Sequence, residues 1–206
     1  MSVITISRQF GAGGRTLGTL VAEKLGYSLV DEDIIEKVAQ KARVSPNWVK
    51  SVEKEAGGRL LKYISGLGPF RKNYLERIGE HKRGYIDGHI YVDLLHEIIK
   101  ELAHEGDCVI IGRGGQYILK DYEDVWHVLL IADLDHRVKF MEEHYELSSR
   151  QAALIVDKHG KRRKNLYRYF HKEDYDQPYL YHIVLNMGRL TIEKAANQVC
   201  KLTEDD

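Results

Sequence analysis

A loop rich in glycine and arginine near the start of the chain has the residue types that bind anions. The stretch ITISRQFGAGGRTLG, residues 4–18, passes from a short alternating apolar segment through Gly11, Gly13 and Gly14 into a helical pattern. Glycines in such a turn permit positive φ angles and let the backbone approach a ligand closely. The unpaired N–H groups at the start of the following helix, and its dipole, favour a phosphate there.

The loop departs from the standard mononucleotide motif at its first Gly and at its Lys. That motif is G-x-x-x-x-G-K-[ST], whereas this chain has Arg8 in place of the first Gly and Gly14 in place of the Lys. Arg15 is the candidate for the missing charge, because a guanidinium can hold two phosphate oxygens. An exposed Arg15 paired with Glu23, or with nothing, is the alternative interpretation.

Two other readings of the loop are weaker. A dinucleotide fingerprint gains support from the spacing of Asp31, but it requires Gly or Ala where the chain has Thr16. A hydroxyl near the helix start instead suits a mononucleotide loop, in which Thr16 is a candidate Mg²⁺ ligand. A glycine turn that binds no ligand is the third reading.

Three later stretches could complete a phosphate site. Asp31 opens an acidic run that could accept hydrogen bonds from a sugar or base, or could simply begin a helix. Arg113, between glycines after a buried-looking strand, could hold a second phosphate, or could form a surface salt bridge. Residues 158–172 contain seven Lys or Arg, three aromatic residues and no acid. This basic segment could bind RNA, form a solvated helix face, or close over a phosphoryl group as a lid over 157–176.

The elements that must position these groups alternate between strand and helix. Five apolar, β-branched runs are expected to be strands: 3–7, 27–31, 107–112, 126–132 and 181–186. Helical spacing occupies 15–25, 33–42, 92–104 and 135–144. This alternation predicts an α/β fold in which helices cover both faces of a parallel sheet. If the strands are neighbours, the Arg113 loop should lie beside the glycine loop.

The chain is expected to form a single domain over residues 1–206, with one insertion. Residues 45–91 are too long for a simple crossover, and we interpret them as an inserted helical flap that closes over a substrate. A surface excursion or an arm for homodimerisation is the alternative.

Composition limits the classes of partner and the cellular location that we expect for the protein. Acidic and basic residues balance at 31 each, so no global field attracts nucleic acid or a membrane surface. Cys108 and Cys200 form no C-x-x-C pair. With no signal peptide and no apolar run near 18 residues, we expect a cytoplasmic protein that does not enter a membrane.

Four motifs together resemble the cytidylate kinase-like family, relatives of bacterial cytidylate kinase among the nucleoside-monophosphate kinases. They are ITISRQFGAGGR at 4–15, LGYSLVDEDII at 25–35, VIIGRGG at 109–115 and the segment from IVDKHGKRRKNLYRYF to LYHIVLNMGRLTIEKAA at 155–196. The resemblance implies a three-layer α/β/α P-loop kinase fold with a five-stranded parallel sheet and an inserted helical subdomain of the type that binds nucleoside monophosphates. It also implies Mg²⁺-dependent transfer of the γ-phosphoryl of ATP to a small nucleotide.

The resemblance also implies roles by position. Asp31 borders the acceptor nucleotide and Arg113 holds its phosphate, while Arg162 and Arg163 are lid arginines that act in catalysis with Arg15 and Arg113. The residues that cradle ATP are Gly11, Ala12, Gly13, Gly14, Arg15 and Thr16. The chain departs from true cytidylate kinases at Gly14, where they have Lys, and at Gly114, where they have Asp.

Three functions follow from these features. The leading hypothesis is a kinase acting on a cytidylate-like monophosphate or a related small phosphorylated acceptor. A regulatory protein that binds nucleotide without turnover is the main alternative, because two charged groups are missing. An RNA-binding module built on residues 158–172 is the third, and the near-zero net charge argues against it.

Overall fold

A parallel five-stranded sheet forms the centre of the protein. The structure is a computed structural model that describes residues 2–47, 49–50, 88–170 and 175–204. Its strands are β1 (Val3–Arg8), β2 (Ser28–Val30), β3 (Cys108–Ile111), β4 (Val125–Ile131) and β5 (Ile183–Asn186). They lie in the order β2-β3-β1-β4-β5, so β1 is central and pairs with both β3 and β4. The predicted α/β class and the five parallel strands are confirmed.

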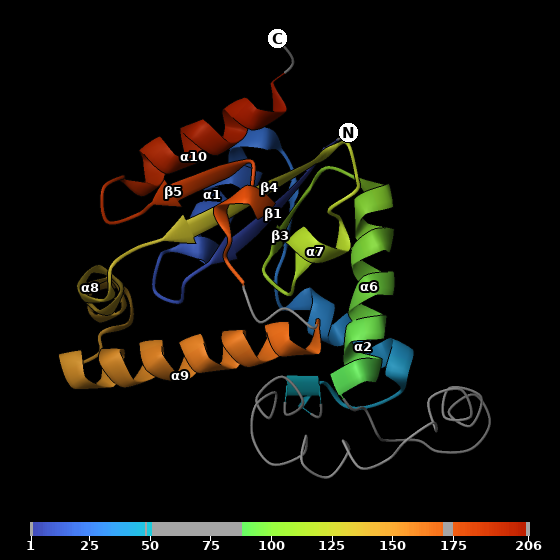
Figure 1. Cartoon of the computed structure of the whole chain (residues 1–206), viewed down its shortest axis with the longest axis horizontal. Coiled ribbons are helices and arrows are strands. Elements are labelled where there is room, and N and C mark those ends of the chain that lie inside the picture. Colours follow the sequence, from blue (N-terminus) through green and yellow to red (C-terminus); the bar gives the residue numbers. More distant parts are fainter. Residues whose placement is uncertain (1, 48, 51–87, 171–174, 205–206) are drawn as a thin grey trace.

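Helices cover both faces of this sheet. The longer ones are α1 (Gly14–Leu25), α2 (Asp33–Ala42), α6 (Gly88–Glu105), α8 (Leu134–Tyr145), α9 (Ser149–Tyr169) and α10 (Ile192–Cys200). The short elements are α7 (Gly115–Ile118) and the 3₁₀ turns η1 (Pro178–Leu180) and η2 (Lys201–Thr203). Figure 1 shows α1 and α10 on one face, α2 and α6 on the other, and α8 and α9 beyond the ends of the strands.

The alternation of side chains along β1 explains the two cores. Ile4 and Ile6 point to the face covered by α1 and α10, and are fully buried there with Leu17 of α1. Val3 points to the opposite face, where Ile99 of α6 belongs to the same buried cluster. Both faces of the strand are buried, as is typical of parallel sheets, although Thr5 and Ser7 on the second face are polar. Burial on both faces holds the end of β1, and hence the glycine loop, in place.

The helical hairpin α8–α9 begins and ends at clear sequence signals. Asp133 caps α8 by accepting a hydrogen bond from the backbone N–H of His136 at 2.7 Å. Ser148 and Gln151 form a reciprocal capping box at the start of α9. Met141 of α8 and Val156 of α9 pack together in a small cluster that includes Phe10 of the glycine loop. The hairpin is therefore anchored directly to that loop.

Two predicted segments lie partly outside the described residues. The proposed flap spans 45–91, and the structure describes only its two ends, including the first turn of α6. The proposed lid spans 157–176, of which 157–170 and 175–176 are described; residues 157–169 form the second half of α9. Both functional assignments stay predictions. Over the described ranges, no helix combines the length and the hydrophobicity needed to cross a bilayer.

Candidate active site

The glycine loop connects the end of β1 to the start of α1, as the sequence predicted. Gly11 and Gly13 have φ angles of +89° and +75°, which disfavour any residue with a Cβ. A Cβ at Gly11 would lie 2.7 Å from the carbonyl oxygen of Arg137, so the loop also runs too close to α8 for a side chain. Gly13 is the N-cap of α1, and no side chain in the described chain caps this helix end. The first amides of α1 are left to face the space outside the sheet.

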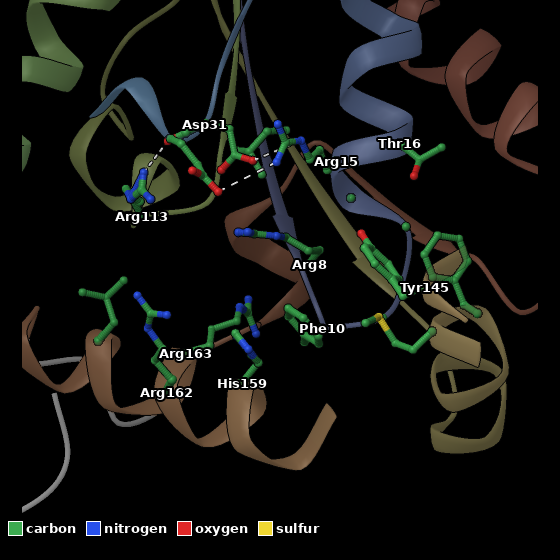
Figure 2. A pocket seen from close by; sticks show the side chains of 18 of the residues that line it. Arg8, Phe10, Arg15, Thr16, Asp31, Arg113, Tyr145, His159, Arg162 and Arg163 are labelled. Carbon is green, nitrogen blue, oxygen red and sulfur yellow. Dashed lines mark hydrogen bonds and ion pairs between the residues drawn. The ribbon is translucent and has the colours of Figure 1, made fainter. Parts of the chain in front are cut away.

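The loop after β3 lies beside it because β1 and β3 are neighbours, as expected. Gly112, Arg113 and Gly114 have φ angles of +71°, +53° and +77°, so three successive residues are in the left-handed region. This unusual conformation aims the Arg113 guanidinium at the carboxyl end of β2, where it donates a hydrogen bond to the backbone carbonyl of Asp31 (Figure 2). A non-glycine residue with positive φ often marks a functional site.

Arg15 and Asp31 come together across the same opening. Arg15 Nε lies 3.8 Å from an Asp31 carboxylate oxygen, and Arg15 Nη1 lies 3.9 Å from one of Glu32 (Figure 2). The predicted alternative pairing with Glu23 is therefore wrong. The Arg15 side chain is 63% exposed, so these ion pairs contribute little to folding and can exchange for a ligand.

The two predicted lid arginines have different surroundings on α9. Arg163 donates two hydrogen bonds to the Asp176 carboxylate, and its guanidinium lies 4.8 Å from the centre of the Tyr167 ring. Burial lowers the pKa of Arg163, but Tyr167 and Asp176 outweigh it and hold the pKa above its usual range. Arg163 is thus a permanently charged and firmly held group. Arg162, its neighbour, also faces the opening.

These elements enclose one cavity of about 420 Å³, a size suited to a nucleotide-sized ligand. Its lining brings together most of the predicted residues: Gly11, Gly13, Gly14, Arg15, Thr16, Asp31, Arg113, Arg162 and Arg163. Ala12 is the exception, since its side chain is buried in the core beneath the loop. Figure 2 shows Thr16 on the far side of the α1 start from Arg113. The roles of all these residues stay predictions.

The cavity is strongly positive although the chain as a whole is neutral. Its cationic side chains are Arg8, Arg15, Lys50, Arg113, Arg162 and Arg163. Asp31 and Glu32 are the carboxylates that line it among the described residues, and Asp176 pairs with Arg163 from outside the lining, so cations still exceed carboxylates by three. Such a concentration of cations at the end of a parallel sheet attracts polyanionic ligands.

An aromatic wall on the α8–α9 side was not predicted. Phe10 stacks on His159 with ring centroids 4.1 Å apart, and Tyr145 lines the cavity nearby. Burial, together with the charges of Arg162 and Lys158, lowers the pKa of His159, so its ring is neutral at pH 7. A neutral ring and a phenyl face can stack on a base. No periodic pattern in the sequence predicts this wall, because its residues come from three separate elements.

The donor set fits a magnesium ion that is held mainly by its ligand. No group of three or more His, Cys, Asp or Glu side chains in the described residues could form a protein metal site. Mg²⁺ commonly keeps several waters and binds through one or two protein oxygens plus phosphates. The Thr16 hydroxyl and the carboxylates of Asp31 and Glu32 line this cavity and could contribute oxygens.

Comparison with known proteins gives the family. The sequence profile of the cytidylate kinase-like family matches residues 3–189. The chain belongs to the cytidylate kinase-like family. This membership supports a P-loop phosphotransferase that uses nucleotide, and it confirms the resemblance carried by the four motifs. A search of curated proteins gave no significant match.

Solved structures share the fold of this family member. A crystal structure of an uncharacterized protein from Eubacterium ventriosum ATCC 27560 is 19% identical, with a TM-score of 0.68 over 98% of this chain and 97% of that one. Shikimate kinase from Bacteroides thetaiotaomicron is 15% identical, with a TM-score of 0.50 over 98% and 97%. At these identities the similarity shows the fold alone, which is that of P-loop kinases.

Proposed function

We propose that this cytidylate kinase-like protein transfers the γ-phosphoryl group of ATP to a nucleoside monophosphate, cytidylate or a close analogue, or to a related small phosphorylated acceptor. The observation that carries the proposal is the shared cavity. The uncapped start of α1 and the Arg113 loop open into the same positive space, so two phosphate-bearing ligands can meet there.

In the proposed reaction an oxygen of the acceptor's phosphate attacks the γ-phosphorus of ATP. One P–O bond forms to the acceptor, the bond between the γ-phosphorus and the β–γ bridging oxygen breaks, and ADP leaves with that electron pair. The loop amides hold the donor phosphates, Arg113 positions the acceptor phosphate, and Arg162 and Arg163 stabilise the charge that spreads over the transferred group. When bound, Mg²⁺ would neutralise further charge between the phosphates.

Arg113 is well placed for its proposed part. Its guanidinium lies at the carboxyl end of β2, where it donates a hydrogen bond to the backbone carbonyl of Asp31. The hydrogen bond to Asp31 orients the guanidinium before a ligand arrives, which reduces the conformational entropy lost when a phosphate binds.

The alternative is a protein that binds nucleotide without turnover. It is favoured by Gly14, where active relatives have a Lys that bears on the terminal phosphates, and by the engagement of Arg15 with Asp31 and Glu32. Binding of ATP without transfer to any acceptor would establish this alternative.

The decisive experiment incubates the purified protein with Mg²⁺ and γ-labelled ATP and a panel of acceptors: CMP, dCMP, UMP, AMP, GMP and shikimate. We expect label in one nucleoside diphosphate and its loss in Arg113→Ala. The matched control is Arg150→Ala, an exposed residue of α9 that does not line the cavity. Label in shikimate would show that a hydroxyl is the acceptor and overturn the proposal. Absence of label with every acceptor would overturn it too.

A further inference from the structure

Arg8 and Gly14 stand where the standard motif has its first Gly and its Lys, and in the structure they lie in contact. A Cβ at Gly14 would be 2.7 Å from Cγ of Arg8 and 3.0 Å from its Cδ. Non-bonded carbon atoms normally stay about 3.5–4.0 Å apart. The hydrocarbon stem of Arg8 therefore occupies the space that a side chain at position 14 would need.

The head of the same side chain reaches the neighbouring strand. A Cβ at Gly112 would lie 2.0 Å from Nη1 of Arg8, so the guanidinium rests directly against the backbone after β3. Only a residue without a side chain leaves room for it there. Figure 2 shows Arg8 crossing the middle of the cavity, with Asp31 and Arg113 on one side and Phe10 on the other.

The guanidinium has no direct partner among the described residues. It forms no hydrogen bond and no ion pair there, although it carries five N–H donors. Burial lowers the pKa of Arg8, while the charge of Asp31 partly offsets this effect. A largely buried cation without a contact partner is unfavourable unless an anion completes the site.

We infer that Arg8 takes both the place and the task of the missing motif lysine, and binds the terminal phosphates of the nucleotide. The substitutions at positions 8 and 14 are then coupled. The positive charge lies on Arg8 instead of on a lysine at position 14, and position 14 is glycine because the stem of Arg8 needs that space. This inference rests on the proposed function and names the residue that serves it.

Arg8 suits this task better than Arg15. Arg15 is 63% exposed and lies within ion-pair distance of two carboxylates, whereas Arg8 extends from the central strand into the cavity with none so close. The planar fork of Arg8 can hold two oxygens of one phosphate group. Its origin on a strand that is hydrogen-bonded on both sides keeps that fork in place.

The test measures binding by calorimetry, with Mg²⁺–ATP and with inorganic tripolyphosphate, and without any acceptor. Arg8→Ala is expected to weaken both ligands roughly 10- to 100-fold, the range for losing charged hydrogen bonds. Arg150→Ala, the matched exposed arginine, is expected to bind as the wild type does. Circular dichroism and urea unfolding check each variant, and Arg8→Gln, which keeps part of the stem but removes the charge, replaces Arg8→Ala with the same expected loss of affinity if Arg8→Ala does not fold.

The coupling itself is tested by the double variant Arg8→Gly/Gly14→Lys, which returns the Gly and the Lys of the standard motif to positions 8 and 14. It is expected to recover most of the affinity that Arg8→Ala loses. Gly14→Lys alone is expected to unfold at a lower urea concentration than the double variant, because the new side chain meets the Arg8 stem. Unchanged affinity in Arg8→Ala, or a folded double variant that binds no better than Arg8→Ala, would overturn the inference.

This experiment separates the inference from the proposed function. A protein that binds ATP through Arg8 but labels no acceptor would refute the kinase proposal and leave the inference standing. Phosphoryl transfer by the wild type, together with unchanged ATP affinity in Arg8→Ala, would refute the inference and leave the kinase proposal standing. A wild-type protein that binds neither ATP nor tripolyphosphate would overturn both.

Discussion

Gly114 occupies the position where true cytidylate kinases carry Asp, and the structure explains why a side chain does not fit there. Its φ angle is +77°, and a Cβ would lie 2.6 Å from Cζ and 2.9 Å from Cε2 of Phe170. The Phe170 ring is itself held, because it packs against the rings of Tyr117 and His96 with centroids 6.0 and 5.9 Å apart. Phe170, at the end of α9, therefore covers the Arg113 loop.

Gly114→Ala is expected to destabilise the protein by about 2–5 kcal/mol. A left-handed conformation costs a residue with a Cβ about 1–2 kcal/mol, and overpacking against a fixed ring adds about 1–3 kcal/mol. Gly26→Ala is the matched control: its φ angle is +71°, but no atom lies within 4 Å of the added Cβ. Only the backbone cost, about 1–2 kcal/mol, applies there.

Urea unfolding of the two variants, each in the wild-type and Phe170→Ala backgrounds, separates the backbone cost of the left-handed conformation from the cost of packing against Phe170. In the Phe170→Ala background the cost of Gly114→Ala should fall to that of Gly26→Ala, while the cost of Gly26→Ala should not change. Equal costs of the two substitutions in the wild-type background would show that Phe170 does not cover Gly114, and would refute the packing argument. Gly114→Asp tests the same contact with the residue that true cytidylate kinases use.

Two further predictions concern buried charge. Burial holds the pKa of His127 at about 4, against its usual 6.5, so protonation favours the unfolded chain. The free energy of unfolding should therefore fall as the pH drops from 6.5 to 4, by about 3 kcal/mol in total. Urea midpoints measured across this range should show the loss, and an equal dependence of the midpoint on pH in His127→Asn would contradict the prediction. Asp176→Asn should cost about 3 kcal/mol because it leaves the buried guanidinium of Arg163 without its carboxylate. The control, Asp157→Asn, removes an exposed pair with Lys161 and should cost under about 0.5 kcal/mol; equal losses in the two variants would show that the Arg163 pair is not special.

Local sequence patterns predicted most of the elements. The helix expected at 33–42 has those bounds, and the first helix begins one residue before the expected Arg15. Apolar periodicity and glycine caps are local signals, so they carry over directly into structure. Periodicity was less informative for α6, which begins at Gly88 rather than at the expected Val92, because its first turn lies before the clear apolar pattern.

The basic segment shows where local patterns left alternatives open. Its charge suggested an RNA site, a solvated helix face or a lid, because Gly160 and a dense run of cations obscure the apolar stripe that would favour a helix. In the structure residues 158–169 complete α9, a helix of 21 residues that starts at a capping box. Packing of Val156 against α8 and of Tyr167 in the core supplies the stability that helix propensity alone does not.

The sequence by itself determined the alternation of strand and helix, the glycine loop after the first strand, and the family to which the chain belongs. The order of the strands then brings the ends of β1, β2 and β3 together, so that Arg8, Asp31 and Arg113 face one cavity. Only the tertiary structure shows that the stem of Arg8 fills the space beside Gly14 and that its head rests on Gly112, over a hundred residues away. Such contacts depend on how far side chains reach across a packed sheet, which spacing along the chain does not encode.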